Sequence, residues 1–242
     1  MAKSQFLEHI PLQIAAKRVF RTASEHKFGA VPSMSQNQTG TIWDVNDTLY
    51  PWSSFDTAGV LTIPAVDAND DGHSVTIIGL GNDYKKLSEE VTISSSGTIT
   101  TTNSFKRVFR AFCTAGGVSN EGNINIQKEG TIVARITADL AQTLMAIYTV
   151  PAGKTAFLMK GTATCQAGAD GNGKMFVRYF GQDTFRIGHT FELSGAGGQY
   201  MYDFATPILI PEKSDIDVRI TTRTNNGRYT AAFDMILMDN PV

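Results

Sequence analysis

Residues of the types that catalyse reactions or bind metals are sparse in this 242-residue chain. The four histidines stand alone, without a cysteine or carboxylate at the short spacing typical of a metal site. No Gly-x-Ser-x-Gly motif marks a nucleophilic serine, and the nearness in sequence of Asp183, His189 and Ser194 does not by itself predict a triad. We therefore predict a protein that is not an enzyme, with no catalytic residue, no metal site and no cofactor.

One acidic segment has the residue types of a cation site. Residues 67–72 read Asp-Ala-Asn-Asp-Asp-Gly, which places oxygen ligands at alternating positions before a glycine, as the calcium loop of an EF-hand begins. The position at which that loop needs a bidentate glutamate holds Ile78, and the flanking segments have strand patterns. We favour an acidic turn here, and the sequence leaves open whether the segment 67–71 binds calcium.

Both tryptophans of the chain fall in one short aromatic segment, which contains Trp43, Tyr50 and Trp52. Large aromatic rings commonly fill a core or anchor a subunit contact, and this is the reading we favour. Exposed rings on a β-sheet also stack on sugars, so a glycan contact is the alternative. A carbohydrate-binding module that recognises cell-surface glycans through these rings is accordingly our hypothesis from a second class of function.

The first 40 residues differ from the rest of the chain. They are basic, through Lys17, Arg18, Arg21 and Lys27, they are interrupted by two prolines, and they end in a polar, turn-rich segment. Residues 10–20 fit a short amphipathic helix or an extended segment equally well. We predict an extended N-terminal arm over residues 1–40 whose basic side chains bind a partner.

From residue 60 onward the apolar residues recur with a period of two, in short segments rich in Thr and Val that are separated by Gly, Asn, Asp or Ser. About one strand per ten residues is typical of sandwiches and jelly rolls. We predict an all-β protein with two antiparallel, jelly-roll-like β-sandwich domains, the first over residues 41–139 and the second over residues 140–242, because residues 138–142 are the one non-strand break near the middle.

The sequence also predicts a hairpin, a solvated strand face and two exposed strand edges. Residues 143–159 read as a β-hairpin, because Pro151 fixes its φ angle and Gly153 can adopt a positive one. Lys106, Arg107 and Arg110 read as the solvated side of a strand. The segments 208–210 and 231–238 read as apolar strand edges that a further copy of the chain covers, which predicts a homo-oligomer, with a trimer favoured.

Composition excludes several classes of partner. A formal charge of −2 offers no general attraction to nucleic acid or to an anionic membrane, and no stretch approaches the length of a membrane span. Cys113 and Cys165 each lie in or beside an apolar segment, and a single pair falls far short of a secreted disulfide framework, so we expect both thiols to be free. We expect synthesis and folding in a cytoplasm.

Several segments together resemble a family of virion structural proteins of tailed bacteriophages, especially marine and cyanobacterial ones. These segments are Thr41-Ile-Trp-Asp44, Tyr50-Pro-Trp52, Thr76-Ile-Ile-Gly-Leu-Gly-Asn-Asp-Tyr84, Ser88-Glu-Glu-Val-Thr92, Tyr148-Thr-Val-Pro-Ala-Gly-Lys154 and Ile210-Pro-Glu-Lys-Ser-Asp-Ile216. They are turn and strand signatures, so the resemblance implies a component of the virion without supplying functional residues. It implies a capsid decoration or cement protein that binds the major capsid protein or other virion proteins. A tail, neck, baseplate or fibre-adaptor protein is the alternative.

Overall fold

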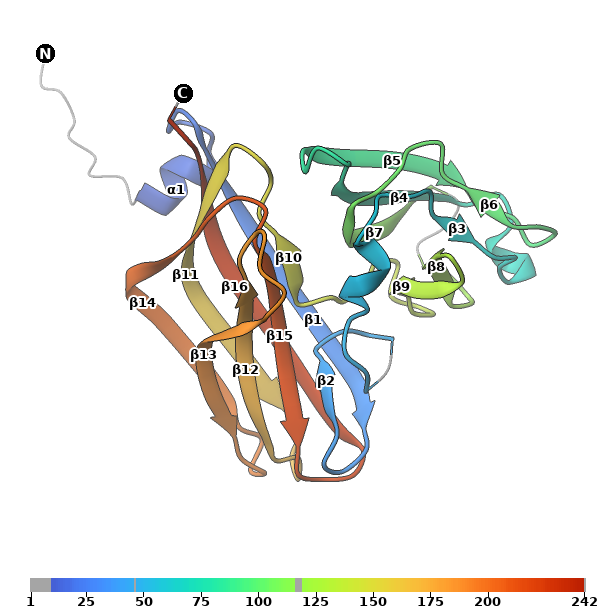
Figure 1. The fold of residues 1–242 in the computed structure, drawn as a ribbon. Helices are drawn as coiled ribbons and strands as arrows, with labels where there is room; N and C mark the ends of the chain where they lie inside the picture. Colours follow the sequence, from blue (N-terminus) through green and yellow to red (C-terminus); the bar gives the residue numbers. More distant parts are fainter. Residues whose placement is uncertain (1–9, 46, 116–118, 242) are drawn as a thin grey trace, which may run out of the picture.

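The computed structural model describes residues 10–45, 47–115 and 119–241, and this part of the chain is almost entirely β-structure in antiparallel sheets (Figure 1). The helical elements are short: α1 (Ile10–Ala15), η1 (Trp52–Phe55) and η2 (Ala68–Asp70). The all-β prediction is confirmed. The more specific prediction of two jelly-roll-like sandwiches is not, because the strands form two larger sheets and two smaller ones that differ in size and strand order.

The two larger sheets pack face to face and form what we call the two-sheet body. One sheet has the order β1-β16-β11-β14, and the other has the order β10-β15-β12-β13 with β2 added beside β15. The strands are β1 (Thr22–Met34), β2 (Thr39–Thr41), β10 (Ile147–Thr149), β11 (Lys154–Cys165), β12 (Gly171–Arg178), β13 (Arg186–Leu193), β14 (Gln199–Ile210), β15 (Asp215–Thr222) and β16 (Gly227–Asp239).

The remaining strands lie between β2 and β10 in the sequence and form the part we call the insert, at the right of Figure 1. One of its sheets has the order β6-β3-β8-β9, and the other has the order β5-β4-β7. The strands are β3 (Thr62–Ile63), β4 (Ser74–Leu80), β5 (Lys86–Thr92), β6 (Ile99–Thr100), β7 (Arg107–Ala115), β8 (Ile124–Lys128) and β9 (Thr131–Ile136).

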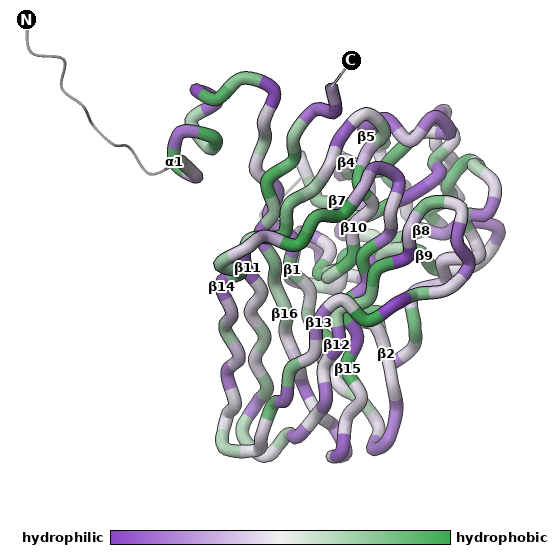
Figure 2. The backbone as a smooth tube through the Cα atoms, turned by 60° about the vertical axis from the view of Figure 1, so that its left-hand side comes forward, coloured by the Kyte–Doolittle hydropathy of each residue, from purple (hydrophilic) through white to green (hydrophobic). Residues whose placement is uncertain are grey.

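Alternation of apolar and polar residues explains most of these strands. In β16 every second residue is buried from Gly227 to Leu237, and β12 and β4 follow the same period. Figure 2 shows the matching change of hydropathy along the strands of the two-sheet body. The buried faces of the body and the insert join in one continuous hydrophobic core, so the two parts share a boundary that excludes water.

The chain passes between the two parts through two segments that lie side by side. Trp43, on the way out, forms an isolated β-bridge with Met145, on the way back, and Ala146 donates its backbone N–H to the carbonyl of Ile42 at 2.9 Å. Both segments cross directly over Gly29 of β1, where an added Cβ would lie 2.3 Å from the nitrogen of Ala146. Glycine is therefore required at this crossing by close backbone approach.

The predicted N-terminal arm is wrong for most of the residues that the structure describes. Thr22–Met34 is strand β1 and pairs antiparallel with β16, and Thr39–Thr41 is β2 and pairs with β15. These residues belong to the same sheets as residues 147–239, so the two-sheet body is built from both ends of the chain. The sequence of the arm gave no sign of this, because β1 has polar residues on one face and needs β16, about 200 residues away, to complete its pairing. Residues 1–9 of the predicted arm lie outside the described residues.

Two predictions about the strands around residue 150 are also corrected. The chain does turn at residues 151–153, with Gly153 at φ +75°, but the flanking strands do not form a hairpin: β10 pairs with β15, and β11 pairs with β14 and β16. The turn carries the chain from one sheet to the other. Residues 231–238 belong to β16, which lies between β1 and β11 and is not an edge, whereas residues 208–210 lie in the edge strand β14.

Candidate functional site

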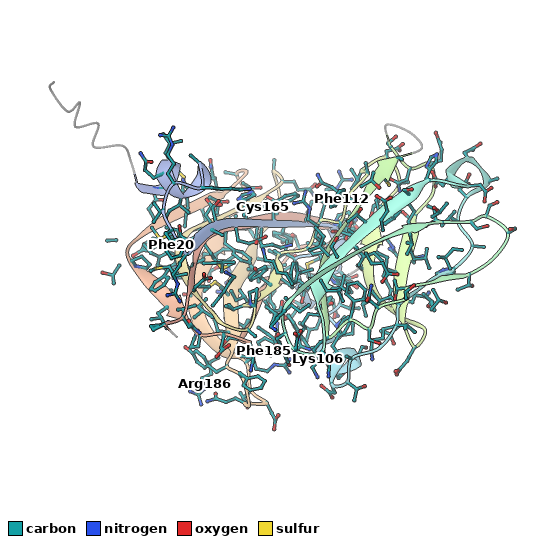
Figure 3. The ribbon with its side chains drawn as sticks, turned by 90° about the horizontal axis from the view of Figure 1, so that it is seen from above. Phe20, Lys106, Phe112, Cys165, Phe185 and Arg186 are labelled. Atoms are coloured by element: carbon teal, nitrogen blue, oxygen red, sulfur yellow. The ribbon has the colours of Figure 1, made fainter. Side chains whose placement is uncertain are left out.

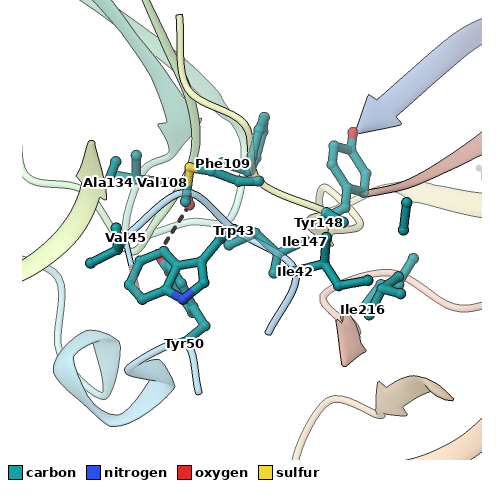
Figure 4. Close-up of a cluster of buried hydrophobic side chains, with 14 of the residues drawn as sticks. Ile42, Trp43, Val45, Tyr50, Val108, Phe109, Ala134, Ile147, Tyr148 and Ile216 are labelled. Atoms are coloured by element: carbon teal, nitrogen blue, oxygen red, sulfur yellow. Dashed lines mark hydrogen bonds between the residues drawn. The ribbon is translucent and has the colours of Figure 1, made fainter. Parts of the chain in front are cut away.

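The aromatic segment that the sequence singled out lies at the boundary between the insert and the two-sheet body. Trp43, Tyr50 and Trp52 are only 1%, 3% and 6% exposed. The ring of Tyr50 lies between the other two, edge-on to both, at centroid distances of 5.2 and 4.8 Å. Figure 4 shows Trp43 and Tyr50 among apolar side chains of both parts, including Val108 from the insert and Ile147 from the body.

Each of these rings has a hydrogen bond that satisfies its polar atom. The Tyr50 hydroxyl donates to the carbonyl of Val108 at 3.2 Å, and Trp52 Nε1 donates to the Asp217 carboxylate at 2.9 Å. Burial raises the pKa of Tyr50 well above its usual range, so the hydroxyl stays a donor. Rings that are buried and bonded in this way have no open face for a sugar, and the glycan alternative loses its basis at these residues.

Beside the aromatic cluster lies a buried ion network centred on Asp215 of β15. Arg107 of β7 donates from Nε and Nη2 to the two carboxylate oxygens, at 2.8 and 3.0 Å, and Arg178 of β12 donates from Nη2 at 2.7 Å. Thr149 adds a hydroxyl donor at 2.6 Å. The prediction that Arg107 lies on the solvated side of its strand is wrong: its side chain is 7% exposed, because it crosses the boundary to reach this carboxylate.

A second buried carboxylate, Asp217, lies two residues along the same strand. It accepts hydrogen bonds from Thr41 at 2.9 Å, from Trp52 and from Arg219, whose Nε lies 2.8 Å away. Buried carboxylates need such partners, since an unpaired charge in a low-dielectric interior is very costly. The donors to Asp215 and Asp217 come from β2, β7, β10, β12 and η1, and from Arg219 of β15 itself, so this network fixes the insert against the body.

The four basic residues of the predicted arm do not form one surface. Lys17 and Arg21 are exposed on either side of the turn that follows α1, both with positive φ, and Arg18 is exposed between them. Arg21 donates to the backbone carbonyl of Asn240. Lys27 is buried on β1 and donates to the carbonyl of Phe109 in the insert. The structure therefore separates Lys27 from the others and gives it an internal role.

The acidic segment 67–71 is a turn around η2 whose carboxylates accept backbone hydrogen bonds. Asp70 is fully buried and accepts from Glu121 and Gly122, both at 2.9 Å, while Asp71 accepts from Ser95 at 2.7 Å. Among the described residues, no three His, Cys, Asp or Glu side chains come together in a group that would suit a metal ion. None of the helices in the described part of the chain is long and apolar enough to span a membrane.

The candidate binding surface is the edge strand β14. It pairs with β11 on one side, and the other edge has no partner strand among the described residues. Met201, Tyr202 and Leu209 of this strand are 58%, 46% and 54% exposed, and Ile187 of the facing edge strand β13 is 54% exposed. An open strand edge with apolar side chains is a site for pairing with another chain.

On the face of β14 that meets β13, aromatic rings join the edges of the two sheets. Tyr200, Tyr202 and Phe204 alternate along β14, and each ring contacts His189 of β13, at centroid distances of 5.6, 5.1 and 5.2 Å. His189 Nε2 is hydrogen-bonded to the Tyr200 hydroxyl, and burial lowers the pKa of His189, which favours the neutral ring. This packing fixes β14 against β13, while the hydrogen-bonding groups on the outer edge of β14 stay accessible.

Some of these functional residues had a signal in the sequence and others had none. The Tyr-x-Tyr-x-Phe spacing at residues 200–204 predicts one aromatic face on a strand. The exposed apolar positions on β14 could be anticipated only after the strand order was known. The Arg107–Asp215 pair joins residues 108 positions apart, and nothing local marks either of them as buried.

Comparison with known proteins assigns no family to this chain. No protein-family model and no curated protein matches it. Among solved structures, a structure of the infectious bursal disease virus Gt strain aligns with 9% identity and a TM-score of 0.19, covering 92% of this chain and 78% of that one. The VP2 subviral particle of the same virus aligns with 9% identity and a TM-score of 0.21, covering 91% and 72%. Likeness at these TM-scores is too weak to support an argument about fold or function.

Proposed function

We propose that the protein is a non-catalytic structural component of a tailed-bacteriophage virion, a capsid decoration or cement protein that bridges neighbouring subunits of the major capsid protein. The observation that carries the proposal is the open edge of β14, a 12-residue strand with exposed apolar side chains on a two-sheet body. The resemblance of the turn and strand segments to phage virion proteins is the reason for placing the protein in a virion.

The junction between the two parts supports a bridging role. A protein that bridges capsid subunits resists their separation only if its own two parts stay fixed to each other. If the insert could move relative to the body, the subunits could separate without breaking any contact. Here the insert is fixed to the body by the bidentate Arg107–Asp215 pair and by the Trp52–Asp217 hydrogen bond. Contacts made by both parts with neighbouring subunits would then reinforce one another by avidity.

We also propose that β14 takes part in self-association on the particle, with a trimer as the favoured state. The free edge of a strand can pair with only one other strand. In any one molecule, β14 therefore pairs either with a further copy of this chain or with a capsid subunit. Sedimentation of the purified protein tests this part: a sedimenting trimer is expected, and a monomer at high concentration, together with single isolated copies on the particle, would contradict it.

The cement role is tested on particles made with and without the protein. Particles that lack it should assemble but release DNA at a lower temperature, because a protein that binds only the assembled shell stabilises that shell. Intact, DNA-filled heads that fail in tail joining or attachment would instead indicate a tail, neck, baseplate or fibre-adaptor protein. Unchanged values in both assays would leave the virion role without support.

Matched variants test whether β14 makes the contact. Met201→Lys combined with Leu209→Lys places charges on the open edge, where side chains are already exposed, and should abolish incorporation into particles while the purified protein stays folded. Val60→Lys combined with Leu140→Lys changes two exposed apolar residues elsewhere, at 44% and 41% exposure, and should leave incorporation unchanged. Equal incorporation of both double variants would exclude β14 as the contact.

A further inference from the structure

A polar groove of about 350 Å³ lies where the insert meets the two-sheet body, directly above the Asp215 ion network. The insert side is formed by the end of η1, the turn after β4 and the start of β7, and the body side by the loops that follow β12 and β14. Figure 3 labels Lys106 on the insert side and Phe185 near the junction on the body side. The groove is lined by Phe55, Asp56, Tyr84, Lys106, Arg107, Arg178, Tyr179, Phe180, Gly181, Gln182, Asp183, Lys213 and Asp215.

The floor of the groove has an excess of positive charge. Asp215 is the carboxylate at its centre, and both Arg107 and Arg178 direct their guanidinium groups at it. All three side chains are largely withdrawn from water, with exposures of 3%, 7% and 17%. Two fixed cations around one anion leave a net charge of +1, and low solvent exposure reduces its screening.

Two lysines at the rim add to this charge. Within the described part of the chain, neither Lys106 nor Lys213 has a carboxylate within ion-pair distance. Lys106 Nζ donates to the backbone carbonyl of Asp56 at 2.6 Å, and Lys213 Nζ lies 4.8 Å from the centroid of the Phe180 ring. Burial, and then the charge of Arg107, lower the pKa of Lys106, as expected for a cation near other cations.

The contacts of Tyr84 and Phe180 leave less ring surface for a stacked sugar than two uncovered rings would offer. Tyr84 and Phe180 contact each other edge to face at 5.7 Å, and each has a cation over its face: Arg107 at 5.7 Å from Tyr84, and Lys213 over Phe180. A sugar could stack only on the remaining face of each of these two rings. The whole lining has four basic side chains and three carboxylates, so its formal charge is +1. Asp56 and Asp183, which offset the two lysines, are exposed to solvent, where their charge is screened more than that of the buried network.

We propose that this groove binds carboxylate side chains of an extended acidic segment of a partner protein. Lys106 and Lys213 would hold the carboxylates at the rim, and the excess charge of the Arg107–Asp215–Arg178 network would attract them. This binding site does not depend on the virion role or on the open edge of β14.

Binding of fluorescent octaglutamate to the intact protein tests the proposal, with octaglutamine as the uncharged probe. The wild type should bind octaglutamate in a salt-sensitive manner and should not bind octaglutamine. Lys106→Gln combined with Lys213→Gln should weaken binding about tenfold or more, as expected when two charge-assisted contacts are removed. Lys85→Gln combined with Arg228→Gln removes the same charge from exposed positions outside the lining and should leave the affinity within about twofold.

Three results with octaglutamate would overturn the proposal. They are the absence of octaglutamate binding by the wild type, equal affinity of the Lys106/Lys213 variant, or equal loss in the Lys85/Arg228 control. Oligogalacturonate serves as a second anionic probe: tighter binding than octaglutamate, lost in the Lys106/Lys213 variant, would overturn the assignment to a protein partner in favour of an acidic glycan. Both double variants should unfold at the same temperature as the wild type. A loss of binding then results from the change in the groove and not from unfolding.

Discussion

Arg107 and Asp215 form a bidentate ion pair across the boundary between the insert and the two-sheet body, with both side chains less than 10% exposed. A buried pair of this kind orients the two parts, because the planar guanidinium fork meets the carboxylate in only one arrangement. The same carboxylate also receives Arg178, so the pair joins the core to the groove above it.

Replacing Arg107 with alanine should lower the free energy of unfolding by about 3–5 kcal/mol, because it removes one partner of a buried charge pair. Arg107→Lys keeps the charge but loses the planar guanidinium group. Its free energy of unfolding should lie between those of Arg107→Ala and the wild type. Lys160→Ala, which breaks a solvent-exposed pair with Asp203, should cost at most about 1 kcal/mol. Urea denaturation measures all three, and a cost for Arg107→Ala no larger than the control would contradict the role of the pair.

Gly29→Ala should destabilise the protein by about 3 kcal/mol or more, since the new methyl group would lie 2.3 Å from two backbone atoms of the crossing segments. The matched control is Gly161→Ala on β11, where an added Cβ meets nothing within 4 Å. That control should be neutral or slightly stabilising. Thermal unfolding compares the two, and equal melting temperatures would show that the crossing is not tightly packed.

Trp52→Ala should cost about 3–5 kcal/mol of stability, because it empties a buried position in the aromatic cluster. Trp52→Phe keeps much of the ring but removes the Nε1–H that donates to Asp217, and should cost about 1–2 kcal/mol. Chemical denaturation of the two variants separates packing from hydrogen bonding. If Trp52→Ala unfolds like the wild type but loses binding to cell-surface glycans, the core assignment is wrong.

Two buried ionisable groups predict a stability minimum near neutral pH. Burial raises the pKa of Asp44 from 3.8 to about 7, and burial lowers the pKa of Lys27 from 10.5 to about 7. Between pH 3.8 and 7 the native state holds the proton on Asp44 and the unfolded state loses it, so stability falls as pH rises. Between pH 7 and 10.5 the native state releases the proton of Lys27 while the unfolded state keeps it, so stability rises with pH.

Single variants separate the two contributions. Asp44→Asn should remove the fall in stability below pH 7 and leave the rise above pH 7 unchanged. Lys27→Met should remove the rise above pH 7 and leave the fall below pH 7 unchanged. Urea midpoints measured from pH 4 to 10 provide the profile. A wild-type protein whose stability is greatest at pH 7 and falls on both sides would contradict the assignment of these two groups.

Limited trypsin digestion should cut after Lys17, Arg18 or Arg21 and spare Lys27. The first three are exposed around the turn that follows α1, whereas Lys27 is buried within a strand paired to β16. Mass spectrometry of the early fragments locates the cuts. Early cleavage after Lys27 in the otherwise intact protein would mean that β1 detaches from the sheet.

The sequence alone determined the class of the fold and many of the local turns. Period-two alternation fixes which side of each strand is buried, and it does so without knowledge of the partner strand, as β16 illustrates. Gly153 was expected to adopt a positive φ angle, and it does so at +75°. These features depend only on neighbours within a few residues, which is why they can be predicted from sequence.

Only the tertiary structure decided which strands pair and which charges are buried. The turn at residues 151–153 gave no sign that β10 and β11 belong to different sheets, because turn residues reverse a chain without choosing its partners. Arg107 has the sequence environment of a solvated residue, and its burial depends on Asp215, 108 positions away. Basic residues near the N-terminus resembled a free arm until β16 supplied the hydrogen bonds of β1. Burial of a charge and pairing of a strand are properties of two distant segments together, so neither segment shows them alone.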